Sequence, residues 1–230
     1  MKLAQEHDCV LCVESGKPGD GVVVNRPSVG RLQIEVKGLA AHASNPEEGR
    51  NAAVELAYQI LKLSRLEDKE KGTNLTTRMI ESGTGNLKKA VVPDRAVGVV
   101  NFRAYTPEEL HRVEAAINNM DQNTLIPGIE VKTTITTLFP VFAKSEKTMK
   151  LARLAQGIYN ELGLNLQASS AAPASDANFT SSVNEATIDS LGPVSGGKNH
   201  TEEEWADATT VIPRLYLLTR MLMELGSRGL

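Results

Sequence analysis

The chain has 230 residues, 41% hydrophobic and 23% charged, and its 25 basic and 28 acidic side chains give a formal net charge of -3. This is the composition of an ordinary globular protein, long enough for one large α/β domain or two modest ones. The slight acidity excludes the basic surface that nucleic-acid binding requires. No stretch approaches the roughly 18 apolar residues of a membrane span, so we expect neither a nucleic-acid nor a membrane partner.

The two cysteines, Cys9 and Cys12, exclude a disulfide framework and favour a reducing, cytoplasmic compartment. An export signal lost with the amino terminus would change that expectation. Their C-x-x-C spacing is typical of redox and zinc motifs, but they lie in an apolar segment that predicts a buried strand. Residues three apart on a strand face opposite sides. We therefore interpret both as structural cysteines.

The first apolar run, residues 8–14, predicts a strand of a parallel sheet that ends at Glu14. A turn rich in glycine and proline follows at once. In open α/β sheets the carboxyl ends of the strands line the ligand crevice. Glu14 is therefore a candidate site residue.

The middle of the chain predicts the order strand, helix, strand, strand, helix, strand. The segments are residues 31–37, 53–61, 74–81, 94–105, 107–120 and 129–135. Alternation marks the strands at 31–37 and 129–135, a glycine-containing loop separates the two strands between them, and Thr106 followed by Pro107 marks the start of the second helix. This order is the split-βαβ, ferredoxin-like arrangement.

After Pro140 the pattern returns to α/β. We expect a helix at about 146–162, a polar turn, a strand near 186–191 and a last helix at about 210–225.

Several chemical classes lack their motifs. There is no nucleophile elbow, no P-loop and no dinucleotide fingerprint. The four histidines, at positions 7, 42, 111 and 200, show no helical metal-binding spacing. Any metal site must therefore combine residues from distant parts of the sequence.

His200 follows Gly197 in a glycine-led loop and precedes three glutamates. Neighbouring carboxylates can orient a ligand histidine. The alternative is a surface histidine where a charged helix begins.

His42 lies at a turn of small residues, where a ligand can approach the backbone, or it serves only capping or packing. Arg103 shares a strand face with Asn101 and can offer its guanidinium to a substrate carboxylate. The alternative for Arg103 is a solvated sheet face. Asp176 follows Ser175 at a predicted helix start and can face a site or simply cap the helix.

Taken together, these motifs resemble the zinc metallopeptidase family that includes glutamate carboxypeptidase of the carboxypeptidase G type, aminoacylase, acetylornithine deacetylase and succinyl-diaminopimelate desuccinylase. The resemblance covers essentially the whole chain. The motifs are Val13-Glu14-Ser15, Ala41-His42-Ala43, Val91-Val92-Pro93-Asp94, Asn101-Phe102-Arg103, Ser175-Asp176-Ala177, Gly192-Pro193 and His200-Thr201.

The resemblance implies an α/β fold, namely the carboxyl-terminal part of a zinc-peptidase catalytic domain interrupted by a ferredoxin-like α+β domain. The partial catalytic domain would comprise residues 1–28 and 139–230. The lid and dimerisation domain would comprise residues 29–138. Two zinc ions and a homodimer formed through the lid are further implications.

The resemblance also assigns roles. Glu14 and His200 would each bind one of the two zinc ions. His42 would stabilise the reaction's oxyanion across the dimer. Arg103, Asp176 and Gly197 would bind the substrate, a small peptide or an N-acyl amino acid.

The departures from the family pattern matter as much. Family members carry an H-x-D pair, a bridging aspartate and a Glu-Glu pair upstream of the position of Glu14, and only thirteen residues precede it here. Ala90 stands where the family commonly has an asparagine. We therefore expect an amino-terminally truncated member, inactive as this chain alone, whose other half is encoded upstream, on a second chain, or lost.

Two functions follow from the resemblance. One is metal-dependent hydrolysis of a peptide or N-acyl amide bond with release of an amino acid. The other is a non-catalytic dimerisation or binding module derived from that family. A missing half should also expose apolar surface around Val10 and Val13.

Overall fold

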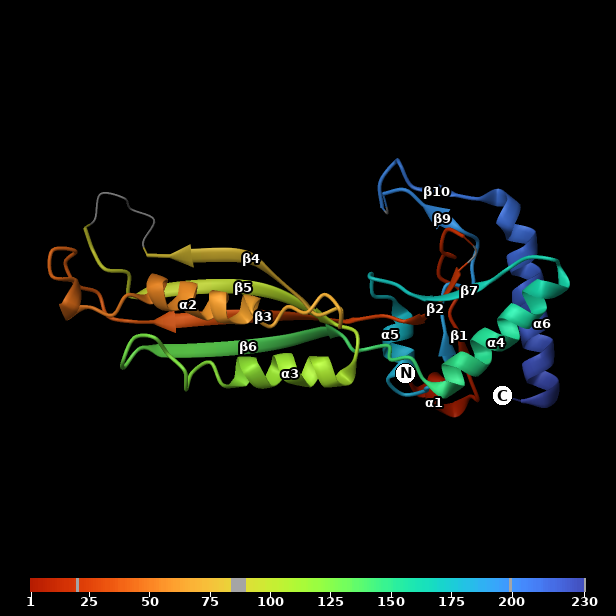
Figure 1. Cartoon of the computed structure of the whole chain (residues 1–230), viewed down its shortest axis with the longest axis horizontal. Coiled ribbons are helices and arrows are strands. Elements are labelled where there is room, and N and C mark those ends of the chain that lie inside the picture. Colours follow the sequence, from red (N-terminus) through yellow and green to blue (C-terminus); the bar gives the residue numbers. More distant parts are fainter. Residues whose placement is uncertain (20, 84–89, 199, 230) are drawn as a thin grey trace. The chain divides into compact units, whose positions relative to one another are not determined.

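The computed structural model describes residues 1–19, 21–83, 90–198 and 200–229. The chain forms two compact units (Figure 1). The α/β unit comprises Met1–Pro27 and Phe139–Leu230, and the inserted unit comprises Ser28–Leu138. None of the helices in the described ranges has the length and apolarity of a membrane span.

The α/β unit is built on short parallel strand pairs. Its elements are α1 (Lys2–Glu6), β1 (Val10–Leu11), β2 (Gly21–Asn25), α4 (Glu146–Glu161), β7 (Gln167–Ser170), α5 (Asp176–Ser181), β8 (Thr187–Ile188), β9 (Ser195–Gly196), β10 (Trp205–Ala206), the 3-10 turn η2 (Ala208–Thr210) and α6 (Val211–Arg228). β1 pairs with β8 in parallel, as the first apolar run predicts. β2 pairs with β7, also in parallel, and neither of these two strands was predicted. α4 and α6 pack on these strands around one apolar cluster.

Three local predictions for this unit were wrong. The first strand spans Val10–Leu11 rather than residues 8–14. Residues 167–170, expected as a polar turn, form β7, because the strand is defined by its pairing with the apolar strand β2 rather than by its own polar sequence. The His200 loop does not lead directly into a helix. It is the loop of a small antiparallel hairpin formed by β9 and β10.

The two cysteines face opposite sides, as predicted, although both lie just outside β1. Cys9 packs against the apolar cluster beneath α4 and α6, whereas Cys12 packs against a separate cluster with Val23 and Phe142. Both are free thiols. Val13 is 58% exposed and Val10 is half-buried, so the expected apolar exposure is found at Val13.

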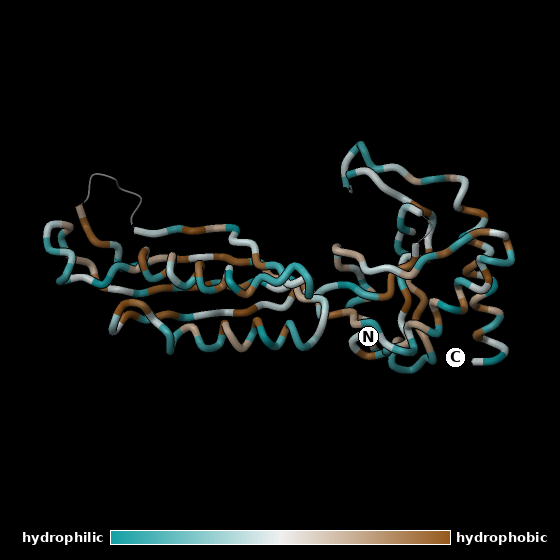
Figure 2. The backbone as a smooth tube through the Cα atoms, in the orientation of Figure 1, coloured by the Kyte–Doolittle hydropathy of each residue, from teal (hydrophilic) through white to brown (hydrophobic). Residues whose placement is uncertain are grey.

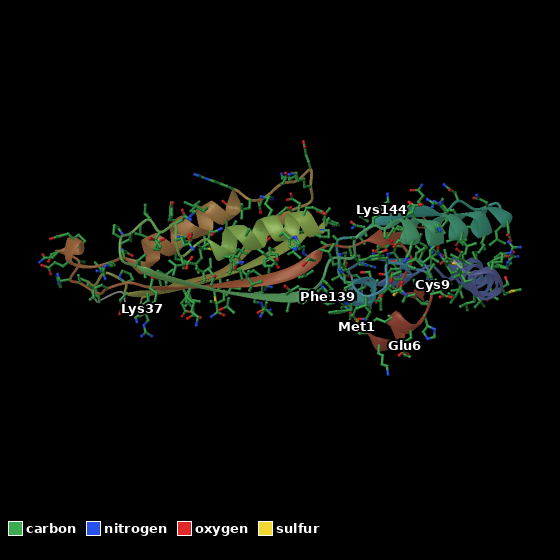
Figure 3. All side chains as sticks on the ribbon, turned by 90° about the horizontal axis from the view of Figure 1, so that it is seen from below. Met1, Glu6, Cys9, Lys37, Phe139 and Lys144 are labelled. Atoms are coloured by element: carbon green, nitrogen blue, oxygen red, sulfur yellow. The ribbon has the colours of Figure 1, made fainter. Side chains whose placement is uncertain are left out.

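The inserted unit has the ferredoxin-like arrangement that its sequence pattern predicts. Its elements are β3 (Ser28–Lys37), the 3-10 turn η1 (Pro46–Glu48), α2 (Ala52–Ser64), β4 (Asn74–Ser82), β5 (Arg95–Ala104), α3 (Pro107–Asn118) and β6 (Glu130–Phe139). The strand order is β4-β5-β3-β6. Figure 3 shows both helices on one face of this sheet.

Local sequence sets the helices of the inserted unit. The side chain of Asn51 accepts hydrogen bonds from the first turn of α2, and Thr106 caps α3 in the same way. Hydrophobic and hydrophilic bands alternate along both helices (Figure 2). Their apolar sides pack on Leu32, Ile34 and Phe102 in the middle of the sheet.

Candidate functional site

Glu14 lies exposed just beyond the carboxyl end of β1. Its carbonyl oxygen accepts a hydrogen bond of 2.8 Å from the Gly192 N–H. A Cβ on Gly192 would lie 2.8 Å from that oxygen, so this close approach requires glycine. The Gly192-Pro193 motif therefore fixes the backbone that carries Glu14.

The Cys12 thiol shows which acids gather at this end of the strands. Burial, together with the negative charges of Asp189, Asp176 and Glu14, raises its pKa to about 11, against the lowering effect of a hydrogen bond with Thr180. Glu14 and Asp176, both singled out from the sequence, therefore lie around the same thiol. Asp189 is a third carboxylate there.

A buried ion pair holds this region together. Arg26 Nε donates to Asp189 Oδ2 at 2.7 Å, and the Ser175 hydroxyl donates to the same oxygen at 2.6 Å. Arg26 also donates to the Pro173 carbonyl at 2.6 Å. The network thus anchors the loop that leads into α5, whose first residue is Asp176.

Sequence reasoning missed Arg26 and Asp189, although a signal was present. Arg26 lies two residues after the apolar run of residues 22–24, and Asp189 interrupts the largely apolar run of residues 186–191. A charge in such a run has to be paired when it is buried. One acid and one base in two apolar runs predict a pair.

Lys17 adds a cation beside these acids. Burial lowers the pKa of its ammonium group, and the nearby Arg26 lowers it further, while Asp189 and Glu14 raise it. The end of the strands around Glu14 is therefore a mixed cluster of acids and bases.

The hairpin of β9 and β10 carries His200 and Gly197. Gly197 has a φ of 89°, and a Cβ there would collide with the Glu203 carbonyl. His200 is exposed with a φ of 64°, and its backbone N–H donates to Glu204 Oε2 at 2.9 Å. Glu204 thus holds the backbone of His200 and not its ring. Gly197 has a clear structural role, and its substrate-binding role stays a prediction.

The zinc ions implied by the resemblance do not fit these residues alone. Within the part of the chain that the structure describes, no group of three or more His, Cys, Asp or Glu side chains could hold a metal ion. Glu14 and His200 gather no third ligand there. Their roles as ligands therefore stay predictions.

In the inserted unit, the geometry of His42 fixes its hydrogen-bonding state. The Ser44 backbone N–H donates to His42 Nδ1 at 3.2 Å, and the Ser44 hydroxyl lies 2.7 Å from the same nitrogen. A backbone N–H can only donate, so Nδ1 is an acceptor and the neutral ring carries its proton on Nε2. His42 is exposed and therefore presents an N–H donor to solvent.

Arg103 lies near the other end of the same unit. It is half-buried on β5, opposite Val29 of β3 on one side and Asn74 of β4 on the other. Asn101 lies two residues away on the same strand, so the two share a face, as predicted.

Strand register separates His42 from Arg103. β3 and β5 pair from Val29 with Arg103 at one end to Lys37 with Arg95 at the other, and His42 follows Lys37. Lys37 lies at one end of the sheet in Figure 3. Eight strand residues at about 3.3 Å each span roughly 26 Å. A single inserted unit therefore cannot bring both side chains to one small substrate.

Comparisons with known proteins agree with this fold. Residues 25–127 match the family model of the peptidase dimerisation domain, M20_dimer. Carboxypeptidase G2 from Pseudomonas sp. (strain RS-16) is 27% identical over 223 residues, which are 96% of this chain and 53% of that protein. The chain thus spans about half the length of the curated relative that it matches.

Solved structures share the architecture. Aminopeptidase PepT from Bacillus cereus superposes with a TM-score of 0.80 at 18% identity, covering 96% of this chain and 59% of that one. YxeP from Bacillus subtilis, described as a dinuclear metal-binding peptidase of the M20 family, gives a TM-score of 0.69 at 14% identity, covering 94% and 56%.

The fold is therefore that of the carboxyl-terminal part of an M20 peptidase. Residues 25–127 are similar to the peptidase dimerisation domain, and the chain as a whole is similar to M20 metallopeptidases.

Proposed function

We propose that this chain forms part of a metal-dependent hydrolase that cleaves a peptide or N-acyl amide bond and releases an amino acid, in the manner of a glutamate carboxypeptidase. The observation that carries the proposal is the placement of His42 and Arg103 at opposite ends of a dimerisation domain. One is a hydrogen-bond donor and the other is a guanidinium. Hydrolysis of an N-acyl amino acid uses both groups, the donor at the amide carbonyl oxygen and the guanidinium at the free carboxylate.

The two side chains have distinct tasks in this proposal. Attack on an amide carbonyl places negative charge on its oxygen, and a preorganised N–H donor stabilises that charge. His42 Nε2–H is such a donor, because Nδ1 already accepts from Ser44. Arg103 holds the free carboxylate of the substrate through its two-pronged guanidinium. The substrate class is therefore a small peptide or an N-acyl amino acid with a free carboxylate.

A homodimer is part of the proposal. Because His42 and Arg103 are roughly 26 Å or more apart within one unit, they can serve one substrate only when two chains combine. The match of residues 25–127 to a dimerisation domain supports this requirement.

We assign no catalytic step to a metal ion in this chain. The described residues bring no third ligand to Glu14 and His200. A two-zinc site of the kind implied by the family would therefore need ligands beyond these two. The same observation favours a second candidate, a non-catalytic dimerisation or binding module.

The test combines three measurements on the purified chain: bound metal by mass spectrometry, hydrolysis of an N-acyl glutamate, and calorimetric binding of N-acetylglutamate. We expect Arg103→Ala to weaken binding at least about tenfold. Arg31→Ala is the matched control, because Arg31 lies on the same sheet face and pairs with Asn101. We expect little metal and no turnover without further ligands.

The outcomes separate the two candidates. Binding that depends on Arg103 but not on Arg31 supports the role of Arg103 in holding the substrate carboxylate, and only turnover distinguishes the hydrolase from a binding module. No binding by the wild-type chain favours the non-catalytic module. Bound metal with turnover would support the hydrolase and overturn the expectation that this chain lacks a sufficient ligand set.

A further inference from the structure

The helix-free face of the inserted sheet carries a group of polar side chains beside Arg103. Arg103 pairs directly with Asn74 of the edge strand β4. Asn101, two residues earlier on β5, pairs with Thr76 of β4. Phe102, between Asn101 and Arg103, packs in the core beneath the helices. Because side chains alternate along a strand and paired residues share a face, the other four lie together on the helix-free face. We name them the Arg103 corner.

Thr76 fixes the roles of the atoms in the Asn74 carboxamide. Thr76 Oγ1 donates to Asn74 Oδ1 at 2.9 Å. The carbonyl side of the carboxamide is therefore engaged, and its Nδ2 group, which can only donate, is the part that can bind an acceptor on a ligand. Asn74 is exposed beside the half-buried Arg103. The guanidinium and this amide group are neighbouring donors, and neighbouring donors suit a carboxylate.

Asn101 supplies the opposite polarity. Its Oδ1 atom is buried and accepts no hydrogen bond from any residue that the structure describes. A buried acceptor without a donor lowers stability, so its presence in a native fold requires an explanation. Asn101 lies about 7 Å along the strand from Arg103, within the span of the long arginine side chain. The Arg103 corner thus joins donors for a carboxylate to an acceptor that needs an N–H group.

We infer that the Arg103 corner recognises two adjacent groups of the substrate: Arg103 and Asn74 bind its carboxylate, and Asn101 Oδ1 accepts the N–H of its amide. An N-acyl amino acid carries these two groups on one carbon atom, so a single ligand satisfies both kinds of partner. Arg103 uncovers the buried acceptor when it turns to the carboxylate. The inference rests on the proposed function and adds two specificity residues, Asn74 and Asn101. The recognised class is a secondary amide with an adjacent carboxylate, in preference to the corresponding ester.

Stability separates a binding role of Asn101 from a structural one. Asn101→Leu replaces the carboxamide with an apolar side chain of similar size. Because the native acceptor has no donor within the described chain, we expect the free energy of unfolding to stay equal or to rise. A clear loss of stability in urea would show that the fold itself needs the carboxamide, and would overturn the assignment of Asn101 to a ligand.

Calorimetry with two ligands tests the recognition directly. N-acetylglutamate has the amide N–H, and O-acetyl-2-hydroxyglutarate has an ester oxygen in its place and nearly the same shape. We expect the wild-type chain to bind the amide about three- to tenfold more tightly, the effect of one net hydrogen bond. Asn101→Leu should bind the amide no more tightly than the ester.

The donor role of Asn74 has its own pair of variants. Asn74→Asp should weaken binding of both ligands about tenfold, because the new carboxylate repels that of the ligand and competes for Arg103. Gln33→Glu makes the same change of charge elsewhere on the helix-free face, opposite Val99. We expect that control to change neither affinity by more than about twofold. Equal effects of the two variants would overturn the role of Asn74.

The remaining outcomes separate this inference from the proposed function. Discrimination by the wild type that Asn101→Leu abolishes supports the inference. Equal binding of amide and ester by the wild type, with Arg103→Ala still weakening both, overturns the role of Asn101 and leaves the proposed function standing. Discrimination that persists in a folded Asn101→Leu chain also overturns that role. A wild-type chain that binds neither ligand overturns this inference together with the substrate binding in the proposed function.

Discussion

Arg26 and Asp189 form a buried ion pair in the α/β unit, with Nε and Oδ2 2.7 Å apart and side chains 3% and 0% exposed. The pair joins the residue after β2 to the residue after β8. Ser175 shares the Asp189 oxygen, so the same contact also holds the start of α5. Breaking a buried pair on one side leaves an uncompensated charge, which costs more than the pair contributes when intact.

Asp189→Asn should therefore lower the free energy of unfolding of this unit by about 3–5 kcal/mol. Glu185→Gln is the control, because it removes the exposed Lys147–Glu185 pair and should cost less than about 1 kcal/mol. Urea unfolding followed by circular dichroism measures both. Equal costs for the two variants would show that the Arg26 charge is not buried as described.

Acid should destabilise the inserted unit partly through Glu109. A hydrogen bond from Arg112 lowers the pKa of this carboxyl group to about 2, with Thr73 and Lys71 contributing, from 4.5. A lowered folded-state pKa adds stability that is present above about 4.5 and is lost as the pH falls towards 2. In Glu109→Gln the free energy of unfolding should fall less steeply over that range than in the wild type. Glu114→Gln, on the same helix, is the control. The same slope in Glu109→Gln and the wild type would contradict the assignment of this acid sensitivity to Glu109.

The Cys12 thiol should react slowly in the folded protein. Burial, together with the nearby carboxylates, raises its pKa to about 11, so its thiolate fraction at pH 8 is about 100-fold below that of an unperturbed cysteine. Alkylation by iodoacetamide, followed by mass spectrometry, should label Cys12 far more slowly in buffer than in urea. Rapid native labelling would instead revive a redox role for the C-x-x-C pair.

Sequence pattern predicted the inserted unit well, because its central strand β3 buries one face and exposes much of the other. The alternation in residues 31–37 and 129–135 records that environment directly. The α/β unit was harder. β7 is polar and is defined only by its pairing with β2, so no local pattern marks it.

Some features of the candidate site were likewise predictable from sequence, and others required the fold. The positions of Glu14 after a strand and of Asp176 at the start of a helix follow from sequence, and both influence Cys12. The Arg26–Asp189 pair joins residues 163 apart and needed the fold. So did the separation of His42 from Arg103, which depends on the register of β3 and β5.

The most direct test of the account is a distance between two chains. Spin labels would be placed on Glu47→Cys, beside His42, and on Glu70→Cys, in the turn before β4 and near Arg103, in chains where Cys9 and Cys12 are alanine. Each chain carries one label, so dipolar coupling reports only distances between copies. A site shared between His42 of one chain and Arg103 of the other predicts a shorter distance in mixed Glu47/Glu70 dimers than in Glu47/Glu47 dimers. The reverse order would contradict a site shared between His42 of one chain and Arg103 of the other.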